Sequence, residues 1–239
     1  MGTFIIAMIM FLALVTIHEF GHFIVAKLSG IKVNEFAVGM GPEIFSKQNG
    51  ETKYSLRLLP IGGYCAMEGE DESSSDPRSY DNAPAFKRFL TILAGPGMNL
   101  LLAVIVFTIV AFNTGTSTTF VGGFSENSPA KEAGISTDDQ IVAINNQNIE
   151  EFTDISKILA DYYGKNTKDS PVEVVTKTAE GSEKTYNITP TFENDIPLLG
   201  ISSKMRDVNF AEAIGLGFKE TWRNVKMIFN ILGMLITGK

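Results

Sequence analysis

Two histidines and a glutamate lie close together in an otherwise apolar N-terminal segment. The motif HEFGH places His18 and His22 four residues apart, with Glu19 directly after the first histidine. On a helix, residues four apart share one face, so the two imidazole nitrogens can hold one tetrahedral metal ion. Glu19 can take a proton from a water molecule beside the metal and pass it to a leaving amine. The motif therefore predicts a hydrolytic site with Zn²⁺ as its cofactor.

The residues around the motif favour a lipid environment. FIIAMIMFLALV and FIVA flank it, so residues 3–25 are long enough to cross a hydrocarbon core of about 30 Å as a helix. We expect a retained transmembrane helix, because the segment has neither a basic N-terminal region nor an A-x-A-like cleavage site. A charge at mid-bilayer costs about 2.5–3.5 kcal/mol, which a bound metal in a wet cavity would offset. The alternatives are an accidental polar cluster and a pair of interfacial histidines.

A second apolar segment, residues 89–112, is also long enough to span a membrane. It contains LAGPGMNLLLA, in which Gly95 and Gly97 would let another helix approach closely. Pro96 and Asn99 are unusual inside lipid, where an unpaired amide is costly. We interpret this stretch either as a notch for helix packing or as a polar cavity lined by Asn99.

The sequence between the two spans predicts a β-loop over about residues 33–64. A hairpin is expected from residue 33 to about 59, with its turn at Asn49-Gly50 and with Tyr54, Leu56 and Leu58 on one face. Basic residues surround this loop, which places it on the cytoplasmic side by the positive-inside rule. The basic residues are Lys27, Lys32, Lys47, Lys53, Arg57, Lys87 and Arg88. The N-terminus and the chain from residue 116 onward would then lie outside.

Composition narrows the class of protein further. The 239 residues carry a net charge of −7, part of it in the run EGEDESSSD, which we expect to be a solvated loop. An acidic chain of this kind argues against nucleic acid as a partner. The single cysteine, Cys65, excludes an internal disulfide.

Residues 116–206 predict a soluble domain of short strands and two helices. The helices are expected over residues 129–133 and 153–163, and Thr153 is the expected cap of the second. Residues 209–236 instead predict an amphipathic helix, because apolar residues recur at alternating spacings of four and three, with Trp222 suited to the interface. This helix is expected to lie on the membrane surface, and the alternative is a core helix of a soluble domain. Its apolar stripe comprises Phe218, Trp222, Val225, Phe229, Leu232 and Ile236.

Taken together, the motifs resemble the site-2 protease family of intramembrane zinc metalloproteases, specifically the bacterial regulator-of-sigma-E-protease type of peptidase family M50. The matching segments are HEFGH, FAVGMGPEIF, YSLRLLPIGGYCAMEGED, SYDNAPAFKRFLTILAGPGMN and AIGLGFKETWRNVKMIFNILGMLITGK. The resemblance implies a multi-domain α/β membrane protein. Its parts would be a membrane region with a re-entrant β-loop (residues 1–115), an extracytoplasmic PDZ domain (116–206) and an amphipathic membrane-surface helix (207–239).

The resemblance also implies residue roles. His18 and His22 would be the zinc ligands and Glu19 the catalytic base. Substrate contacts would come from Tyr54, Leu56 and Leu58 in the β-loop, from Asn99, and from Leu198, Leu199, Gly200 and Ile201 in the carboxylate-binding loop of the PDZ domain. The PDZ domain would either bind substrate tails or filter access to the site.

One departure from the family concerns the third zinc ligand. The family supplies it as the aspartate of a Leu-Asp-Gly motif in a later transmembrane helix, and this sequence contains no Asp-Gly dipeptide before Lys239. We expect either an N-terminal fragment or a shortened form, whose two-histidine site would bind metal weakly and not turn over.

Three functions remain as hypotheses. The first is a zinc endopeptidase in the bacterial cell membrane, a multi-pass protein in contact with lipids, that cuts single-span membrane proteins such as anti-sigma factors or remnant signal peptides. The second is a catalytically inactive fragment or membrane PDZ protein that binds substrate tails. A soluble HEXXH peptidase is the third, and the lipid-facing flanks of His18 argue against it.

Overall fold

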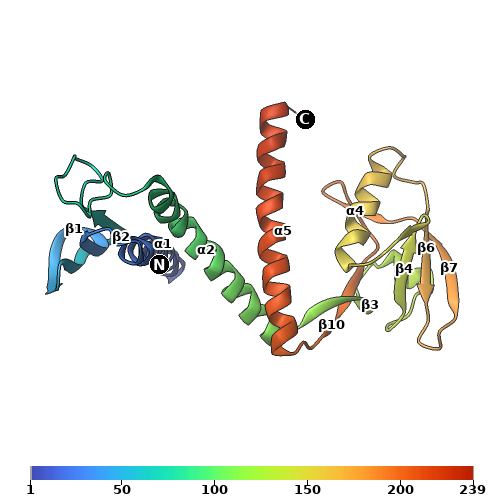
Figure 1. Ribbon diagram of the computed structural model, residues 1–239. Helices are drawn as coiled ribbons and strands as arrows, with labels where there is room; N and C mark the ends of the chain where they lie inside the picture. Colours follow the sequence, from blue (N-terminus) through green and yellow to red (C-terminus); the bar gives the residue numbers. More distant parts are fainter. Residues whose placement is uncertain (1, 239) are drawn as a thin grey trace. The chain divides into compact units, whose positions relative to one another are not determined.

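The computed structural model describes residues 2–238. The chain forms two compact units, Met1–Phe107 with Gly217–Lys239, and Thr108–Leu216. In chain order the elements are α1 (Gly2–Leu28), β1 (Val33–Asn49), β2 (Thr52–Met67), α2 (Ala85–Thr114), β3 (Thr116–Phe124), α3 (Pro129–Glu132), β4 (Gln140–Ile144), β5 (Gln147–Asn148), α4 (Phe152–Tyr163), β6 (Val172–Lys177), β7 (Glu183–Ile188), β8 (Thr191–Glu193), β9 (Ile196–Leu198), β10 (Ile201–Arg206) and α5 (Phe210–Thr237) (Figure 1).

The two expected spans are both helical. Among the described residues, only α1 and α2 are long and apolar enough to cross a membrane. α2 begins before residue 89, because the Pro84 carbonyl accepts the N–H groups of Lys87 and Arg88 and so closes the first turn. The Lys87 ammonium in turn donates to the Ser29 carbonyl at 2.7 Å, just past the end of α1. This bond ties the two helices together at one end.

Close contact between α1 and α2 depends on a glycine in each helix. A Cβ atom on Gly21 would lie 2.3 Å from the carbonyl oxygen of Ala94, which is impossible without a shift of the backbone. Small residues at helix interfaces allow this approach in membrane proteins. The close contact brings the histidine face of α1 against α2.

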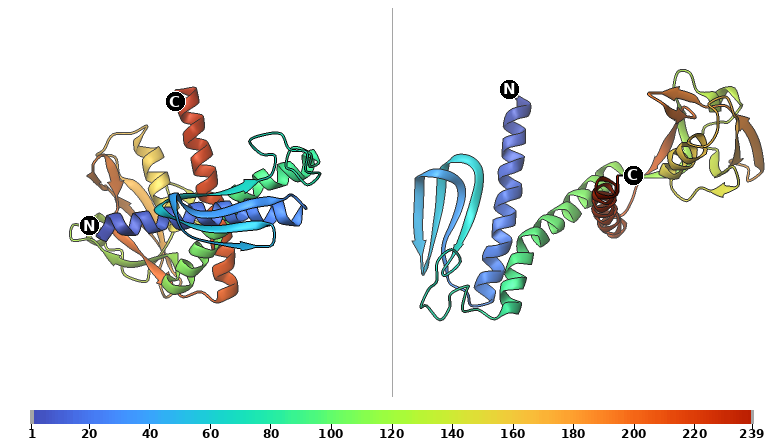
Figure 2. Two further views of the ribbon diagram at one scale, coloured as in Figure 1. Left: turned by 90° about the vertical axis from the view of Figure 1, so that its left-hand side faces the viewer. Right: turned by 90° about the horizontal axis from the view of Figure 1, so that it is seen from above.

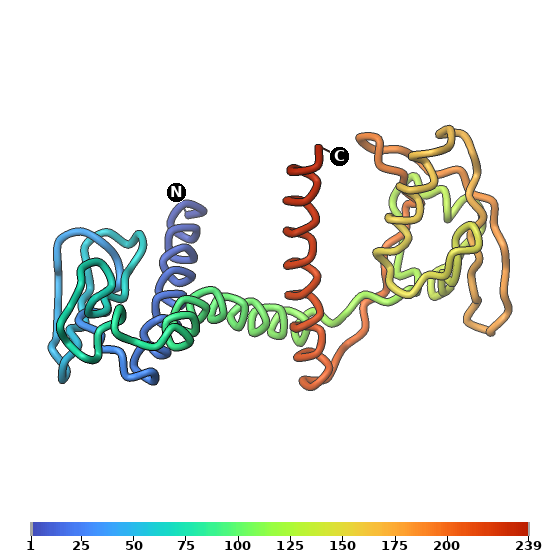
Figure 3. The backbone as a smooth tube through the Cα atoms, turned by 45° about the horizontal axis from the view of Figure 1, so that its top comes forward, coloured from blue at the N-terminus to red at the C-terminus, as the bar shows by residue number. Residues whose placement is uncertain are grey.

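The predicted hairpin is confirmed, with its turn at Gly50 in the left-handed region (φ +61°). β2 continues to Met67, beyond the expected end at about residue 59. The reason is a second, long-range pairing in which Phe36 faces both Tyr54 and Cys65, so that one stretch of β1 has partners on both sides. The resulting sheet packs along α1 (Figures 2 and 3).

The acidic run after β2 forms neither helix nor strand, as expected of a loop. Its two ends are nevertheless anchored, because the Lys32 ammonium lies 3.3 Å from Glu68 and 3.2 Å from Asp76.

The unit Thr108–Leu216 is built on an antiparallel sheet with the strand order β10-β3-β4-β6-β7, where β5 pairs with β4. Alternate residues of β6 point inward, so that Val172 and Val174 are fully buried against Ile141 of β4 and Leu159 of α4. Each such apolar side chain stabilises the fold by roughly 1.5–3 kcal/mol. β10 lies at an edge of this sheet, and β8 and β9 form a separate pair.

α4 confirms the expected helix but not its expected cap. Glu151 is the N-cap, and its backbone N–H donates to the Asp154 carboxylate at 2.8 Å. Thr153 lies inside the helix instead, because the reciprocal Glu151 and Asp154 arrangement satisfies the free N–H groups of the first turn.

α5 is helical over the predicted amphipathic segment, and most of its large apolar side chains are exposed, with Trp222 60% exposed. The Lys226 ammonium lies 5.5 Å from the centre of the Trp222 ring, a cation–π contact.

Candidate metal centre

The two histidines lie together on the face of α1 that meets α2. His18 and His22 are half-buried, and their ring centroids are 4.9 Å apart with the planes at 74°. This is the geometry expected for residues one helical turn apart. Each ring can therefore direct one nitrogen toward the same position.

The ring of His22 is held by the backbone of α2. Its Nδ1 lies 2.7 Å from the carbonyl oxygen of Thr91. A carbonyl oxygen only accepts hydrogen bonds, so Nδ1 of His22 carries the proton. In the neutral ring Nε2 then holds the lone pair that a metal ion needs.

A glycine on α2 lets both Nε2 atoms lie close to that helix. A Cβ atom on Gly95 would lie 2.4 Å from Nε2 of His22 and 2.6 Å from Nε2 of His18. Any side chain at this position would displace the rings. The Nε2 atoms of both histidines thus lie beside a position where α2 has no side chain.

Asn99 completes the same face of α2. Its Nδ2 lies 3.3 Å from Nδ1 of His18, while its Oδ1 is buried without a hydrogen-bond partner among the described residues. A buried polar atom without a partner costs roughly 1–3 kcal/mol. Thr91, Gly95 and Asn99 follow one another at four-residue spacing and so form one stripe facing the two histidines.

Glu19 lines a cavity of about 230 Å³ next to His22. The cavity is enclosed by both helices, by β2 and by the loop that follows it. Its lining residues are Glu19, His22, Cys65, Met67, Glu70, Tyr80, Thr91 and Ile92. A water molecule can therefore reach both the carboxylate and the imidazole from one space.

Cys65 is the buried thiol of this cavity. Burial, and then the nearby carboxylates of Glu19 and Glu70, raise the pKa of the thiol to about 12. A thiol with this pKa stays protonated at neutral pH and is therefore a poor nucleophile. Cys65 contributes packing between β2 and α1.

The residues present fit a zinc ion. Imidazole nitrogens are donors that zinc prefers, and the Nε2 atoms of both histidines lie beside Gly95, where α2 has no side chain. Zinc in catalytic sites has three protein ligands. Within residues 2–238, no group of three or more histidine, cysteine, aspartate or glutamate side chains is arranged around one metal position. The described residues thus offer two candidate ligands, His18 and His22.

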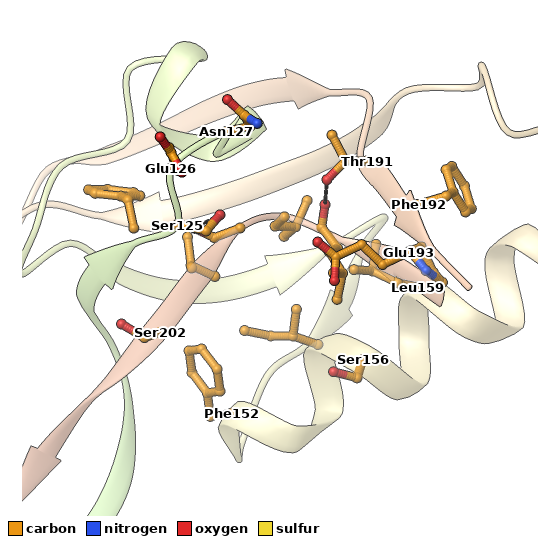
Figure 4. Close-up of a pocket in the computed structure, with 17 residues that line it drawn as sticks. Ser125, Glu126, Asn127, Phe152, Ser156, Leu159, Thr191, Phe192, Glu193 and Ser202 are labelled. Carbon is orange, nitrogen blue, oxygen red and sulfur yellow. Dashed lines mark hydrogen bonds between the residues drawn. The ribbon is translucent and has the colours of Figure 1, made fainter. Parts of the chain in front are cut away.

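The remaining predicted site residues lie in two other places. Tyr54 and Leu56 sit inside the β1–β2 sheet, where each has partners on both sides, and Leu58 is exposed near the sheet's bend. The segment Leu198, Leu199, Gly200 and Ile201 lies in the other unit. There it lines a groove of about 760 Å³ between α4 and β10, together with Phe152 and Ser156 of α4 (Figure 4).

Sequence reasoning missed Thr91, Cys65, Glu70 and Tyr80 around the cavity. Thr91 contacts His22 through its backbone carbonyl, and a backbone contact cannot be predicted from the residue type. The one available signal was the four-residue spacing of residues 91, 95 and 99, which places all three on one face of a helix.

Comparison with known proteins identifies the family of this chain. The model of peptidase family M50 matches residues 6–239 of the chain. A Clostridium acetobutylicum protein named as a zinc metalloprotease is 39% identical over 98% of this chain and 68% of its own length. A similarly named protein of Clostridium perfringens is 38% identical over 98% of this chain and 69% of its own length. Eep of Enterococcus faecalis, named as a protease, is 28% identical over 100% of this chain and 76% of its own length.

The family match covers nearly the whole chain, and its two apolar helices carry the HEFGH motif and the stripe that faces it. The chain therefore belongs to peptidase family M50 and is a membrane zinc metalloprotease of the site-2 protease type.

Proposed function

We propose that this chain is a zinc-dependent intramembrane endopeptidase that cuts the transmembrane segments of single-span membrane proteins, in regulated proteolysis of substrates such as anti-sigma factors or remnant signal peptides. One observation carries the proposal: the Nε2 atoms of His18 and His22 both lie beside Gly95, where two apolar helices meet.

His18 and His22 would hold zinc through Nε2. Bound zinc supplies a Lewis acid that polarises a peptide carbonyl and lowers the pKa of a neighbouring water toward about 7. Glu19, in the adjoining cavity, takes the proton from the attacking water and delivers it to the leaving amine. The apolar walls of the two helices limit the water that reaches the site.

A substrate helix must unwind before it is cut, because helical carbonyls are hydrogen-bonded and shielded. The C-terminal part of β2 offers a place for the unwound segment. Residues 63–67 pair on one side only, and a Cβ atom on Gly63 would lie 3.9 Å from Cγ of Glu19. An extended substrate added to this edge would pass beside the catalytic base.

The chain would be a multi-pass protein of a bacterial cell membrane. The positive-inside rule, applied to the basic residues around β1 and β2, supports a cytoplasmic position for this loop and an extracytoplasmic one for residues 116–206. The exposed apolar face of α5, with Trp222 and the cation of Lys226 beside it, supports a position at the lipid surface.

Zinc binding tests the proposal directly. The purified chain in detergent is titrated with Zn²⁺ against a chromophoric chelator. The same titration is made with His22→Leu and with a control variant, Phe20→Leu, which changes the same helix but keeps both histidines. Wild type and the control should bind zinc, and His22→Leu should lose at least tenfold in affinity because one of two ligands is gone. Equal affinity of all three proteins would refute the metal site.

We propose a second function for the groove between α4 and β10, binding of extended peptide tails by a PDZ-type domain. The carbonyl of Leu199 accepts N–H from Ala130 (3.1 Å), and the carbonyl of Gly200 accepts N–H from Ser125 (2.9 Å). In a trans peptide the N–H points opposite to the C=O, so the N–H groups of Gly200 and Ile201 point away from these partners. Such N–H groups suit a terminal carboxylate.

Gly200 is the position that tests tail binding. Its φ is +71°, and a Cβ atom would lie 2.7 Å from Oγ of Ser125. In fluorescence polarisation with the full chain, a peptide ending in an apolar residue should bind at least about tenfold more tightly than its C-terminal amide, an effect of about 1.4 kcal/mol. Gly200→Ala should abolish this preference.

The matched control for this experiment is Gly181→Ala, also a glycine with positive φ (+87°) but with no atom within 4 Å of the added Cβ. It should keep the preference for the free carboxylate. If the acid and the amide bind equally to the wild-type chain, the groove does not recognise tails, and a filtering role remains.

A further inference from the structure

We propose that Asn99 is a positioning residue for His18: its side-chain carbonyl accepts the Nδ1–H group of the imidazole and so leaves Nε2 free for zinc. The inference rests on the proposed zinc site and assigns Asn99 a role toward the metal ligand. The two histidines differ in their partners. Nδ1 of His22 lies beside a carbonyl oxygen, which can only accept, whereas Nδ1 of His18 lies beside an amide, which can donate or accept.

His22 shows what a zinc-binding ring needs. Its Nδ1 can only donate to the Thr91 carbonyl at 2.7 Å, so its Nε2 is the unprotonated nitrogen. Ligating histidines in metalloproteins usually donate their second N–H in this way, which fixes both the tautomer and the orientation of the ring. His18 needs an equivalent acceptor at its own Nδ1.

The side chain beside Nδ1 of His18 is the amide of Asn99, at 3.3 Å. With Nδ2 turned toward His18, the amide forces Nδ1 to accept, which puts the proton on Nε2 and excludes metal binding. The oxygen and nitrogen of an amide have the same shape, and only their partners decide which way round they lie. The other end of the amide is buried and has no hydrogen-bond partner among residues 2–238, so the contact with His18 decides the orientation.

Turned the other way, Asn99 presents Oδ1 to His18 and accepts the Nδ1–H. α2 then holds both rings in the same tautomer through acceptors at residues 91 and 99, two turns apart. Gly95 lies midway between them, and both Nε2 atoms lie beside it. One face of α2 therefore carries the hydrogen-bond acceptors for the Nδ1–H groups of both histidines.

The tautomers can be read without metal or activity. The chain has only two histidines, so ¹⁵N-histidine labelling gives two sets of ring signals. In the metal-free chain in detergent, at a pH where both rings are neutral, His18 and His22 should both carry the proton on Nδ1. Free imidazole side chains prefer the Nε2–H form, so the Nδ1–H form reports an acceptor.

Substitution of Asn99 should change one ring only. In Asn99→Leu, His18 should shift to the Nε2–H form while His22 is unchanged, and zinc affinity should fall about 10–100-fold. Asn99→Asp keeps an acceptor and should preserve the tautomer and the affinity. Asn113→Leu is the control, since its amide donates to the Ile109 carbonyl at the exposed end of the same helix.

The outcomes separate the inference from the function on which it rests. An Nε2–H tautomer for His18 in the metal-free wild-type chain overturns the inference even if zinc binds. The expected tautomers in a chain that binds no zinc support the role of Asn99 and refute the proposed function. If Asn99→Leu does not fold, the wild-type tautomer and Asn99→Asp still decide.

Discussion

Glu19→Gln is expected to abolish peptide bond cleavage while leaving zinc bound. The substitution keeps the size and shape of the side chain but removes the group that accepts a proton from water. Loss of a general base lowers a rate by about 10²–10⁴-fold. Zinc affinity should stay close to that of the wild type, because the ligands are His18 and His22. The measurement is cleavage of a single-span substrate in membranes, with zinc content determined on the same samples.

The same exchange at Glu70 is the matched control. Glu70 lines the same cavity but comes from the loop after β2, and its carboxylate accepts the backbone N–H of Met67 at 3.3 Å. Glu70→Gln should therefore cleave far faster than Glu19→Gln. Unchanged cleavage by Glu19→Gln would remove Glu19 from the role of base, and loss of zinc from that variant would make Glu19 a ligand instead.

Features of the membrane region that depend on residues close together in the sequence could be predicted. Runs of more than twenty apolar residues predict helices, and the HEFGH motif places His18, Glu19 and His22 relative to one another once a helix is assumed. The polar character of Asn99 in an apolar span was compatible with either a packing notch or a polar cavity. Its proximity to Nδ1 of His18 depends on how the two helices cross, which the sequence does not specify.

Long-range pairing accounts for most of what could not be predicted. The second half of β2 pairs with the start of β1, about thirty residues earlier, so the expected hairpin ended too soon. The cap of α4 was misassigned because Thr153 and Glu151 are both compatible with a helix start. Only the bond between the Glu151 N–H and Asp154 distinguishes them.

A single methyl group on Gly95 should have the largest structural effect in the membrane region. In Gly95→Ala the added Cβ would lie 2.4 Å from Nε2 of His22 and 2.6 Å from Nε2 of His18, so the rings or the helices must move. Overpacking of this kind costs about 1–3 kcal/mol of stability. Once displaced, the two Nε2 atoms no longer point to the same position. Zinc affinity should therefore fall at least as far as on loss of a hydrogen-bond partner of a ligating histidine, about 10–100-fold.

Gly97→Ala separates this effect from the general consequences of removing a helical glycine. Gly97 lies two residues further along α2, and no atom lies within 4 Å of its added Cβ. Alanine favours a helix over glycine by roughly 0.5–1 kcal/mol, so Gly97→Ala should be neutral or stabilising and bind zinc normally. Thermal unfolding and zinc titration of both purified variants measure the difference. If Gly95→Ala matches Gly97→Ala in both, the space in front of the two histidines is not where the metal binds, and the α1–α2 crossing would have to present His18 and His22 to a different position.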